Sequence, residues 1–319
     1  MCSSYTRFVP ISLTSTSEGN GADGLRKSVY EVVTDRILER LEQGVIPWHK
    51  PWNATGGAPR NLISGREYRG VNVWLLGSQD YTSPYWVTFK QAKSLGGSVR
   101  KGERSTPVVF WKWIERASED PETSETQTQK IPLVRYFSVF NVEQCDGISH
   151  ARLEAKQDEP EPFNPIEAAE AIVSGYPEPP TIAHDGRGSA YYRPATDSIR
   201  MPERETFDSE AHFYATLFHE ITHSTGHESR LARPGITNPI RHASHNYSQE
   251  ELVAEMGAAF LAAEAGIDAE GLMDNSAAYV ASWLKALRND KKLVVFAAAQ
   301  AQKAVDHILD RSSECEAAE

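Results

Sequence analysis

The sequence predicts an α+β protein built from two domains, and three observations support that class. The chain has 319 residues, which is more than a single hydrophobic core usually serves. Its first half alternates strand-like segments with short helices, whereas its second half reads mostly as helices. Its charge is also divided, because residues 26–116 carry about 15 Lys and Arg against 8 Asp and Glu, in a chain with a formal net charge of −11. A basic half joined to an acidic half indicates two different tasks.

The chain begins with a segment that shows no hydrophobic periodicity. Residues 1–25 are rich in Ser, Thr and Gly, which predicts a disordered tail. From Val29 to Gln43 apolar residues recur every four positions, which predicts an amphipathic helix, and Gly44 is placed to end it. A stiff loop is expected from Pro47 to Asn53, where two tryptophans are separated by His and Lys and flanked by prolines.

We assign residues 26–150 to the first domain, which is expected to be a small mixed unit. Runs of apolar and aromatic residues predict a strand at 108–114 and its partner strand at 135–141. The polar segment 116–130 between them predicts a solvated insertion in the hairpin. Shorter elements are expected before these strands, namely a turn at 64–65, a strand or helix start at 85–89, a helix at 90–95 and a basic hairpin at 96–103.

Residues 151–164 are rich in Glu and Pro and predict a linker to the second domain, residues 165–319. The elements expected there are a helix at 165–174, a hairpin at 181–201, a helix from Glu210, a loop at 231–247 and helices at 248–261, 275–287 and 293–309. Asp208 or Ser209 is placed to cap the helix that begins at Glu210, and Gly226 is placed to end it.

That helix contains the sequence His219-Glu220-Ile221-Thr222-His223, which has the spacing H-E-x-x-H of helical zinc hydrolases. Positions four apart share one face of a helix, so both imidazoles can bind one metal ion. Glu220 is then close enough to accept a proton from a water molecule at that ion. The pattern predicts Glu220 as the catalytic residue and His219 and His223 as metal ligands; chance occurrence on a surface helix is the alternative.

A catalytic zinc site needs a third protein ligand, and the following helix supplies two carboxylates. Glu251 and Glu255 lie four apart on one face, next to a core stripe of larger apolar residues. We predict Glu251 as the ligand and Glu255 as a carboxylate that bonds a ligand histidine. The alternative is that Ser248 and Glu251 form a capping box, which would leave Glu255 as the ligand. Small residues at 254 and 257–259 are expected to let this helix approach the metal helix closely.

The basic half interleaves aromatic and cationic residues, a composition typical of single-strand binding surfaces, in which bases stack on rings and cations follow phosphates. The alternative is that the tryptophans form the core of a small domain, because Trp is buried on average. The residues predicted to contact DNA are Trp48, Lys50, Trp52, Arg60, Arg69, Asn72, Trp74, Trp86, Lys90, Arg100 and Lys101.

Several classes of protein are disfavoured by composition. Three widely spaced cysteines form neither a disulfide framework nor a metal knuckle, which fits a reducing cytoplasm. No apolar run approaches the ~18 residues of a membrane span, so no membrane partner is expected.

The motifs of both halves together resemble a known family. Pro47-Trp48 to Asn53, the run Tyr68 to Asn72, Gly97 to Gly102 and Phe140 to Cys145 are similar to the N-terminal domain of ArdC-type antirestriction proteins. Residues from about 164 to 310 resemble the zincin-type metallopeptidase domain that follows it in that family. Such proteins also resemble the N-terminal region of some conjugative DNA primases. The resemblance implies a single-stranded-DNA-binding domain, a metallopeptidase-like domain and a plasmid or mobile-element setting in which incoming DNA is protected from host restriction.

The expected cofactor is Zn²⁺, with Mn²⁺ as another divalent metal that such a site accepts. The expected partners are single-stranded DNA, double-stranded DNA as a further option, and a protein substrate that the sequence does not name. One hypothesis is a protective DNA-binding protein, a second is a zinc-dependent protease acting on DNA-associated host proteins, and a third is a metal-dependent nuclease. The third is the weakest, because two-metal nucleases favour carboxylate clusters.

Overall fold

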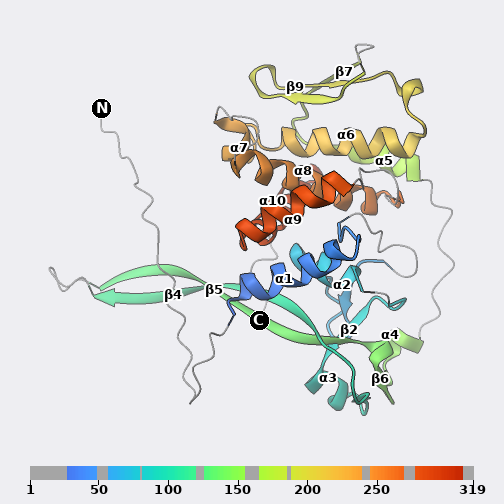
Figure 1. Ribbon diagram of the computed structural model, residues 1–319, viewed down its shortest axis with the longest axis vertical. Helices are drawn as coiled ribbons and strands as arrows, with labels where there is room; N and C mark the ends of the chain where they lie inside the picture. The colour runs from blue at the N-terminus through green and yellow to red at the C-terminus, as the bar shows by residue number, and fades with distance from the viewer. Residues whose placement is uncertain are drawn as a thin grey trace.

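The computed structural model describes residues 27–48, 57–79, 81–119, 126–154, 165–184, 188–238, 245–268 and 277–311, and describes no side chains within 112–133. Helices and sheets alternate through these residues, which confirms the α+β class (Figure 1). The predicted tail at 1–25, Lys50 and Trp52 lie outside the described residues.

Helix α1 (Val29–Glu42) begins and ends as the sequence predicts. Ser28 and Glu31 form a reciprocal capping box at its start, and Gly44 follows its end with a φ of 78°. The run Tyr68 to Asn72 leads into helix α2 (Val71–Gly77). Gly70 makes the change of direction with a φ of 57°, a conformation that favours glycine.

A four-stranded sheet in the order β1-β2-β5-β4 forms the centre of the N-terminal half. Its strands are β1 (Arg60–Asn61), β2 (Tyr85–Thr88), β4 (Thr106–Glu119) and β5 (Thr126–Asn141). The predicted pairing of 108–114 with 135–141 is confirmed, and it is antiparallel. Pairing continues to Glu119 and Thr126, so much of the predicted polar insertion belongs to a long two-stranded ribbon that extends from the body (Figure 1).

The basic hairpin predicted at 96–103 is wrong. Its strand β3 (Ser98–Val99) pairs with β6 (Cys145–Asp146), which is more than forty residues away, so the partner is not the adjacent chain. Helix α3 (Phe89–Ser94) covers one face of the sheet, with Ala92 packed against Val87. Two short elements, η1 (Val142–Gln144) and α4 (Ala151–Glu154), complete this half.

The C-terminal half begins with α5 (Pro165–Gly175) and a three-stranded sheet. The hairpin predicted at 181–201 is only partly correct. Strand β8 (Tyr191–Arg193) pairs with β9 (Ser198–Met201) in antiparallel, as in a hairpin, but β7 (Thr181–His184) pairs with β9 in parallel. Short 3₁₀ turns η2 (Pro194–Thr196) and η3 (Arg204–Thr206) lead to the helices. The helices are α6 (Glu210–Ser224), α7 (Pro234–Thr237), α8 (His245–Glu264), α9 (Ala277–Asn289) and α10 (Leu293–Ile308).

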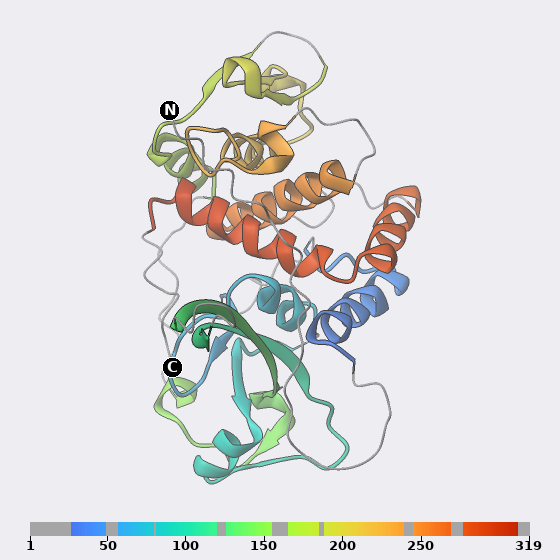
Figure 2. The same cartoon turned by 90° about the vertical axis from the view of Figure 1, so that its left-hand side faces the viewer.

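The two halves share their largest hydrophobic cluster instead of building separate cores. Buried side chains of α1 and α2 belong to the same cluster as those of α6, α8 and α10. The Trp74 ring packs 4.5 Å from the Phe260 ring, and Trp48 meets Trp283 edge-on at 6.1 Å. In Figure 2, α10 crosses the molecule between the upper helices and the lower sheet. None of the described helices is long and apolar enough to cross a membrane.

Candidate functional site

Helix α6 brings the two histidines of the H-E-x-x-H sequence together. Ser209 caps the helix, because its hydroxyl accepts a hydrogen bond from the His212 amide at 3.1 Å. The Nε2 atoms of His219 and His223 lie 3.1 Å apart, so both imidazoles point at one place. Glu220 follows on the same helix and is 8% exposed. The prediction that Gly226 ends the helix is wrong. The C-cap residue is Thr225, in a right-handed conformation, and Gly226 does not adopt a positive φ.

Glu251 of α8 completes the group. Its two carboxylate oxygens lie 3.7 Å from His219 Nε2 and 3.7 Å from His223 Nε2. One ligand atom from each of the three residues lies within 4.8 Å of the others, so these residues can hold a single metal ion. The capping-box alternative fails, because α8 begins at His245 and Ser248 therefore lies inside the helix.

The donor set fits a divalent transition metal. Two imidazole nitrogens and a carboxylate are the ligands of many catalytic zinc sites, which leave one position for water or substrate. The side chains of His219 and Glu251 are 25% and 29% exposed, so the group is reachable from solvent. The same nitrogen and oxygen donors also suit Mn²⁺.

Close packing of α6 against α8 holds the three residues together. Gly257 lies against Thr222, and a Cβ at that glycine would stand only 2.4 Å from Thr222 Cγ2. Ala254 and Ala258 on the same helix are fully buried. The prediction that small residues permit a close approach of the two helices is confirmed, and Gly257 is the position where any side chain would force them apart.

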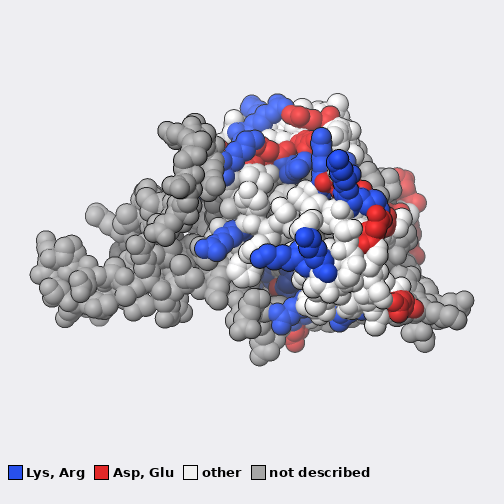
Figure 3. Space-filling model, turned by 90° about the horizontal axis from the view of Figure 1, so that it is seen from below, with Lys and Arg blue, Asp and Glu red and all other residues white. Residues whose placement is uncertain are grey.

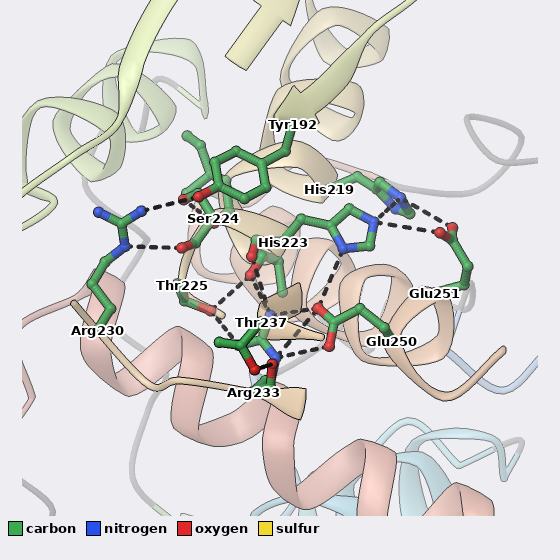
Figure 4. A network of polar contacts seen from close by, with 12 residues as sticks. Tyr192, His219, His223, Ser224, Thr225, Arg230, Arg233, Thr237, Glu250 and Glu251 are labelled. Atoms are coloured by element: carbon green, nitrogen blue, oxygen red, sulfur yellow. Dashed lines mark hydrogen bonds and ion pairs between the residues drawn. The ribbon is translucent and has the colours of Figure 1, made fainter. Parts of the chain in front are cut away.

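A buried ion pair supports His223 from behind (Figure 4). Glu250 Oε1 lies 3.3 Å from His223 Nδ1, and Arg233 donates to both Glu250 oxygens, at 2.6 Å from Nη2 and 3.0 Å from Nε. Arg233 and Glu250 are 4% and 5% exposed. Burial alone would raise the pKa of Glu250, but hydrogen bonds from His223 and Arg233 outweigh burial and lower that pKa below its ordinary value.

Sequence reasoning missed both members of this pair. Glu250 was visible only as a neighbour of Glu251, and Arg233 sits in the segment predicted as a loop. Arg233 also donates to the Thr222 carbonyl at 2.8 Å and to the Thr225 hydroxyl, so it ties the end of α6 to α8. Gly235 also packs closely against Glu250, because a Cβ at Gly235 would stand only 2.8 Å from Glu250 Cβ.

Glu255, one turn after Glu251, connects α8 to two distant segments. Its Oε2 accepts a hydrogen bond from Trp48 Nε1 at 3.0 Å and another from the Tyr279 hydroxyl. Removal from solvent raises the pKa of the Glu255 carboxyl. Glu250 is a further carboxylate that lies against a ligand histidine ring, and the sequence did not predict it. Trp48 therefore belongs to the surroundings of the metal-ligand group.

The predicted DNA contacts of three tryptophans are wrong. Trp48 and Trp74 are 0% exposed and Trp86 is 2% exposed, so no base can stack on these rings. Trp86 instead packs edge-on against Tyr81 at 5.6 Å, and its neighbours form a small cluster under the sheet. The alternative interpretation, that these tryptophans are core residues, is confirmed, because Trp48 and Trp74 belong to the largest hydrophobic cluster and Trp86 to a smaller one.

Most of the other predicted DNA contacts also have structural partners. Asn72 bonds both the amide and the carbonyl of Val109, at 2.6 and 2.8 Å, which fixes α2 to the edge of β4. Arg69 pairs with Asp306, Arg60 with Glu67 at 3.1 Å, and Arg100 with Glu103 at 2.9 Å. Lys90 and Lys101 are exposed. Figure 3 views the molecule from the side on which Figure 1 places α3 and β6, and Lys and Arg predominate over the middle of this face.

Comparison with known families agrees with this arrangement. Residues 27–140 match the N-terminal domain of anti-restriction factor ArdC, and residues 167–300 match a zincin-like metallopeptidase. Fold and ligand geometry thus define a zincin-like metallopeptidase unit joined to an ArdC-type N-terminal unit. The chain belongs to the ArdC antirestriction family.

Solved and curated relatives support that membership. A metal-free crystal structure of the antirestriction ArdC protein from the R388 plasmid is 40% identical, covers 90% of this chain and 99% of its own, and superposes with a TM-score of 0.69. A Mn(II)-bound structure of that protein gives 38% identity, 91% and 100% coverage and a TM-score of 0.68.

Two curated relatives differ strongly in length. The uncharacterized protein y4eC of Sinorhizobium fredii is 33% identical over 90% of this chain and 94% of its own. DNA primase TraC of Escherichia coli is 37% identical over 89% of this chain, but the match spans only 27% of the primase.

Proposed function

We propose that this chain is an antirestriction protein of a plasmid or other mobile element. It binds single-stranded DNA with its N-terminal half, carries a zinc peptidase centre in its C-terminal half and protects incoming DNA from host restriction in the cytoplasm. The observation that carries the proposal is the convergence of His219, His223 and Glu251 in a chain whose other half presents a basic face. Membership in the antirestriction family supports the biological role.

The chemistry assigned to the C-terminal half is peptide-bond hydrolysis. A divalent metal held by His219, His223 and Glu251 would supply a Lewis acid. Glu220 takes a proton from the attacking water and passes it to the leaving amine. Glu250 fixes the orientation of the His223 ring through Nδ1, and Arg233 keeps Glu250 ionised and in place.

The DNA-binding part of the proposal is tested with the full-length protein and a fluorescent 20-nucleotide oligo(dT). Affinity is expected to fall as salt rises, with a log–log slope of about −0.7 for each phosphate contact. A duplex of the same length shows whether double strands also bind. Binding that is absent, or that does not change with salt, contradicts a function based on the charge of the N-terminal half.

A second candidate is a protease that acts on DNA-associated host proteins. It is favoured by the openness of the ligand group. Structural zinc sites are closed by four protein ligands, whereas the described residues offer three here and the group is partly exposed. The buried support of His223 by Glu250 also suits a site that must hold its geometry during turnover.

The Glu220→Gln variant separates these two functions. Glutamine keeps the shape of the side chain but cannot act as a base, so hydrolysis should fall about 100- to 10,000-fold while metal and DNA binding persist. We measure transfer of unmodified DNA into a restricting host, with the exposed Glu228→Gln as the matched control. Loss of protection supports the protease; full protection supports a role that needs DNA binding alone.

A further inference from the structure

Three exposed aromatic rings lie along the sheet where the β4–β5 ribbon leaves the body. Phe89 is 48% exposed, Tyr136 is 47% exposed and Trp111 is 37% exposed. By contrast, the tryptophans at 48, 74, 86 and 283 are buried. Exposed rings gathered in one region are typical of a binding surface.

Strand register places Tyr136 and Trp111 on the face of the sheet that is covered by α3, the helix that begins with Phe89. Val87 lies opposite Phe140 and packs against Ala92, so α3 covers the face to which Phe140 points. Side chains alternate along a strand, so Tyr136 shares that face with Phe140. Trp111 pairs with Val134 and thus lies diagonally from Tyr136, within reach of an aromatic ring.

Cations lie at the end of this surface nearest the body. Helix α3 begins with Phe89 and carries the exposed lysines Lys90 and Lys93. Lys93 Nζ lies 5.1 Å from the centre of the Phe89 ring. Glu103 and Asp146 pair with Arg100 at 2.9 and 3.6 Å. Among the described residues, Lys90 and Lys93 form no ion pair, so the surface combines exposed rings with unpaired lysines in a chain that is acidic as a whole.

We propose that single-stranded DNA lies along this surface, which we call the aromatic strip and define as Phe89, Trp111 and Tyr136 with Lys90 and Lys93. Bases stack on the rings and the lysines bind phosphates. The assignment rests on the proposed DNA-binding function and gives it a location that the buried tryptophans do not provide.

The opposite face of the ribbon supplies a matched control. Phe137 is 48% exposed, adjacent to Tyr136 in sequence and nearly equal to it in exposure. It points to the other face, where its ring meets Phe110 edge-on at 5.9 Å. Tyr136→Ala and Phe137→Ala thus remove similar rings from the same strand and differ in the face they change.

The experiment compares oligo(dT) binding by full-length Tyr136→Ala, Phe89→Ala and Phe137→Ala proteins, with thermal melting to verify folding. Tyr136→Ala and Phe89→Ala are each expected to weaken binding roughly 10-fold without changing its salt dependence. Tyr136→Trp is expected to retain binding, because stacking survives. Lys93→Gln is expected to reduce the salt slope by about one phosphate contact.

Three results would overturn the assignment. Equal binding by Tyr136→Ala and Phe137→Ala, while the parent protein binds DNA, removes the strip but leaves the DNA-binding function intact. Failure of the parent protein to bind removes the function itself. A change of sedimentation coefficient in Tyr136→Ala, with DNA affinity unchanged, identifies the strip as a contact between two copies of the chain.

Discussion

The metal-ligand group and the DNA-binding surface were predicted from different kinds of sequence signal. The predicted metal ligands lie together in the structure, whereas three of the predicted DNA contacts are buried. His219, His223 and Glu251 come together as expected. Trp48, Trp74 and Trp86, expected at a DNA surface, are buried. A spacing of four residues is converted by helix geometry into a shared face, whereas an aromatic-rich composition does not say which rings face solvent.

The largest effect that tests this contrast is the loss of a metal ligand. His219→Ala and His223→Ala are each expected to abolish stoichiometric zinc, because two remaining ligands do not hold a catalytic ion. Binding of oligo(dT) should persist, since the ligands lie in the other half of the chain. Zinc content by mass spectrometry and DNA affinity by anisotropy are the measurements, with His227→Ala as a control histidine outside the ligand group. Full zinc occupancy in both variants would remove the site.

A second prediction tests the corrected position of the tryptophans. Trp86→Ala should lower the free energy of unfolding by about 3–5 kcal/mol, because it opens a cavity in a closed cluster. Tyr136→Ala, which removes an exposed ring, should change it by about 0.5 kcal/mol. Urea denaturation measures both. If Trp86→Ala were instead neutral for stability and weakened DNA binding, the ring would belong to the binding surface after all.

The same contrast shows which parts of the fold were predictable. Helices α1 and α6 follow local periodicity and side-chain caps, and α10 follows periodicity; the bounds of all three agree with the prediction within a few residues. Pairing of β3 with β6 and the parallel β7–β9 contact join residues that local patterns cannot relate. Helix α2 was missed because its Val-Asn-Val-Trp start favours strands, and packing against the core overrides that preference.

The three residues of the metal-ligand group were predictable from the sequence, but the residues that contact them from the side away from the metal were not. Glu251 could be placed because it lies on a predicted helix beside apolar positions. The contact of Glu250 with His223, however, spans 27 residues, and that of Arg233 with Glu250 spans 17. Such contacts depend on how α7 and α8 pack, which no local signal reports. The same is true of Trp48, whose partner Glu255 is 207 residues away.

A third prediction concerns Glu250, which contacts the ligand His223. Glu250→Gln removes the negative charge behind His223 and should weaken zinc affinity about 10- to 100-fold, as other substitutions behind metal ligands do. Competition with a chelator measures the affinity, and circular dichroism checks folding. Glu264→Gln on the same helix, where Glu264 forms an exposed ion pair with Arg311, is the matched control. Equal zinc affinity in the two variants would show that Glu250 serves only the packing of Arg233.

The smallest effect on zinc affinity is expected from the loss of the hydrogen bond between Trp48 and Glu255, which joins the two halves. Trp48→Phe keeps most of the ring but removes the Nε1 donor to Glu255, so a partly buried carboxylate retains the Tyr279 hydroxyl and loses one donor. We expect the free energy of unfolding to fall by about 1–3 kcal/mol and zinc affinity to fall only slightly, because Glu251 lies one turn from the altered contact.

Trp74→Phe is the control for Trp48→Phe, since its ring packs on Phe260 of the same helix α8. If Trp48 positions Glu251 through α8, its variant should weaken zinc binding more than Trp74→Phe does at equal loss of stability. If both variants lose stability and neither changes zinc affinity, the contact binds the halves together without influencing the metal-ligand group. The second outcome would make the two halves structurally joined but functionally separate, with DNA binding and metal chemistry open to independent change.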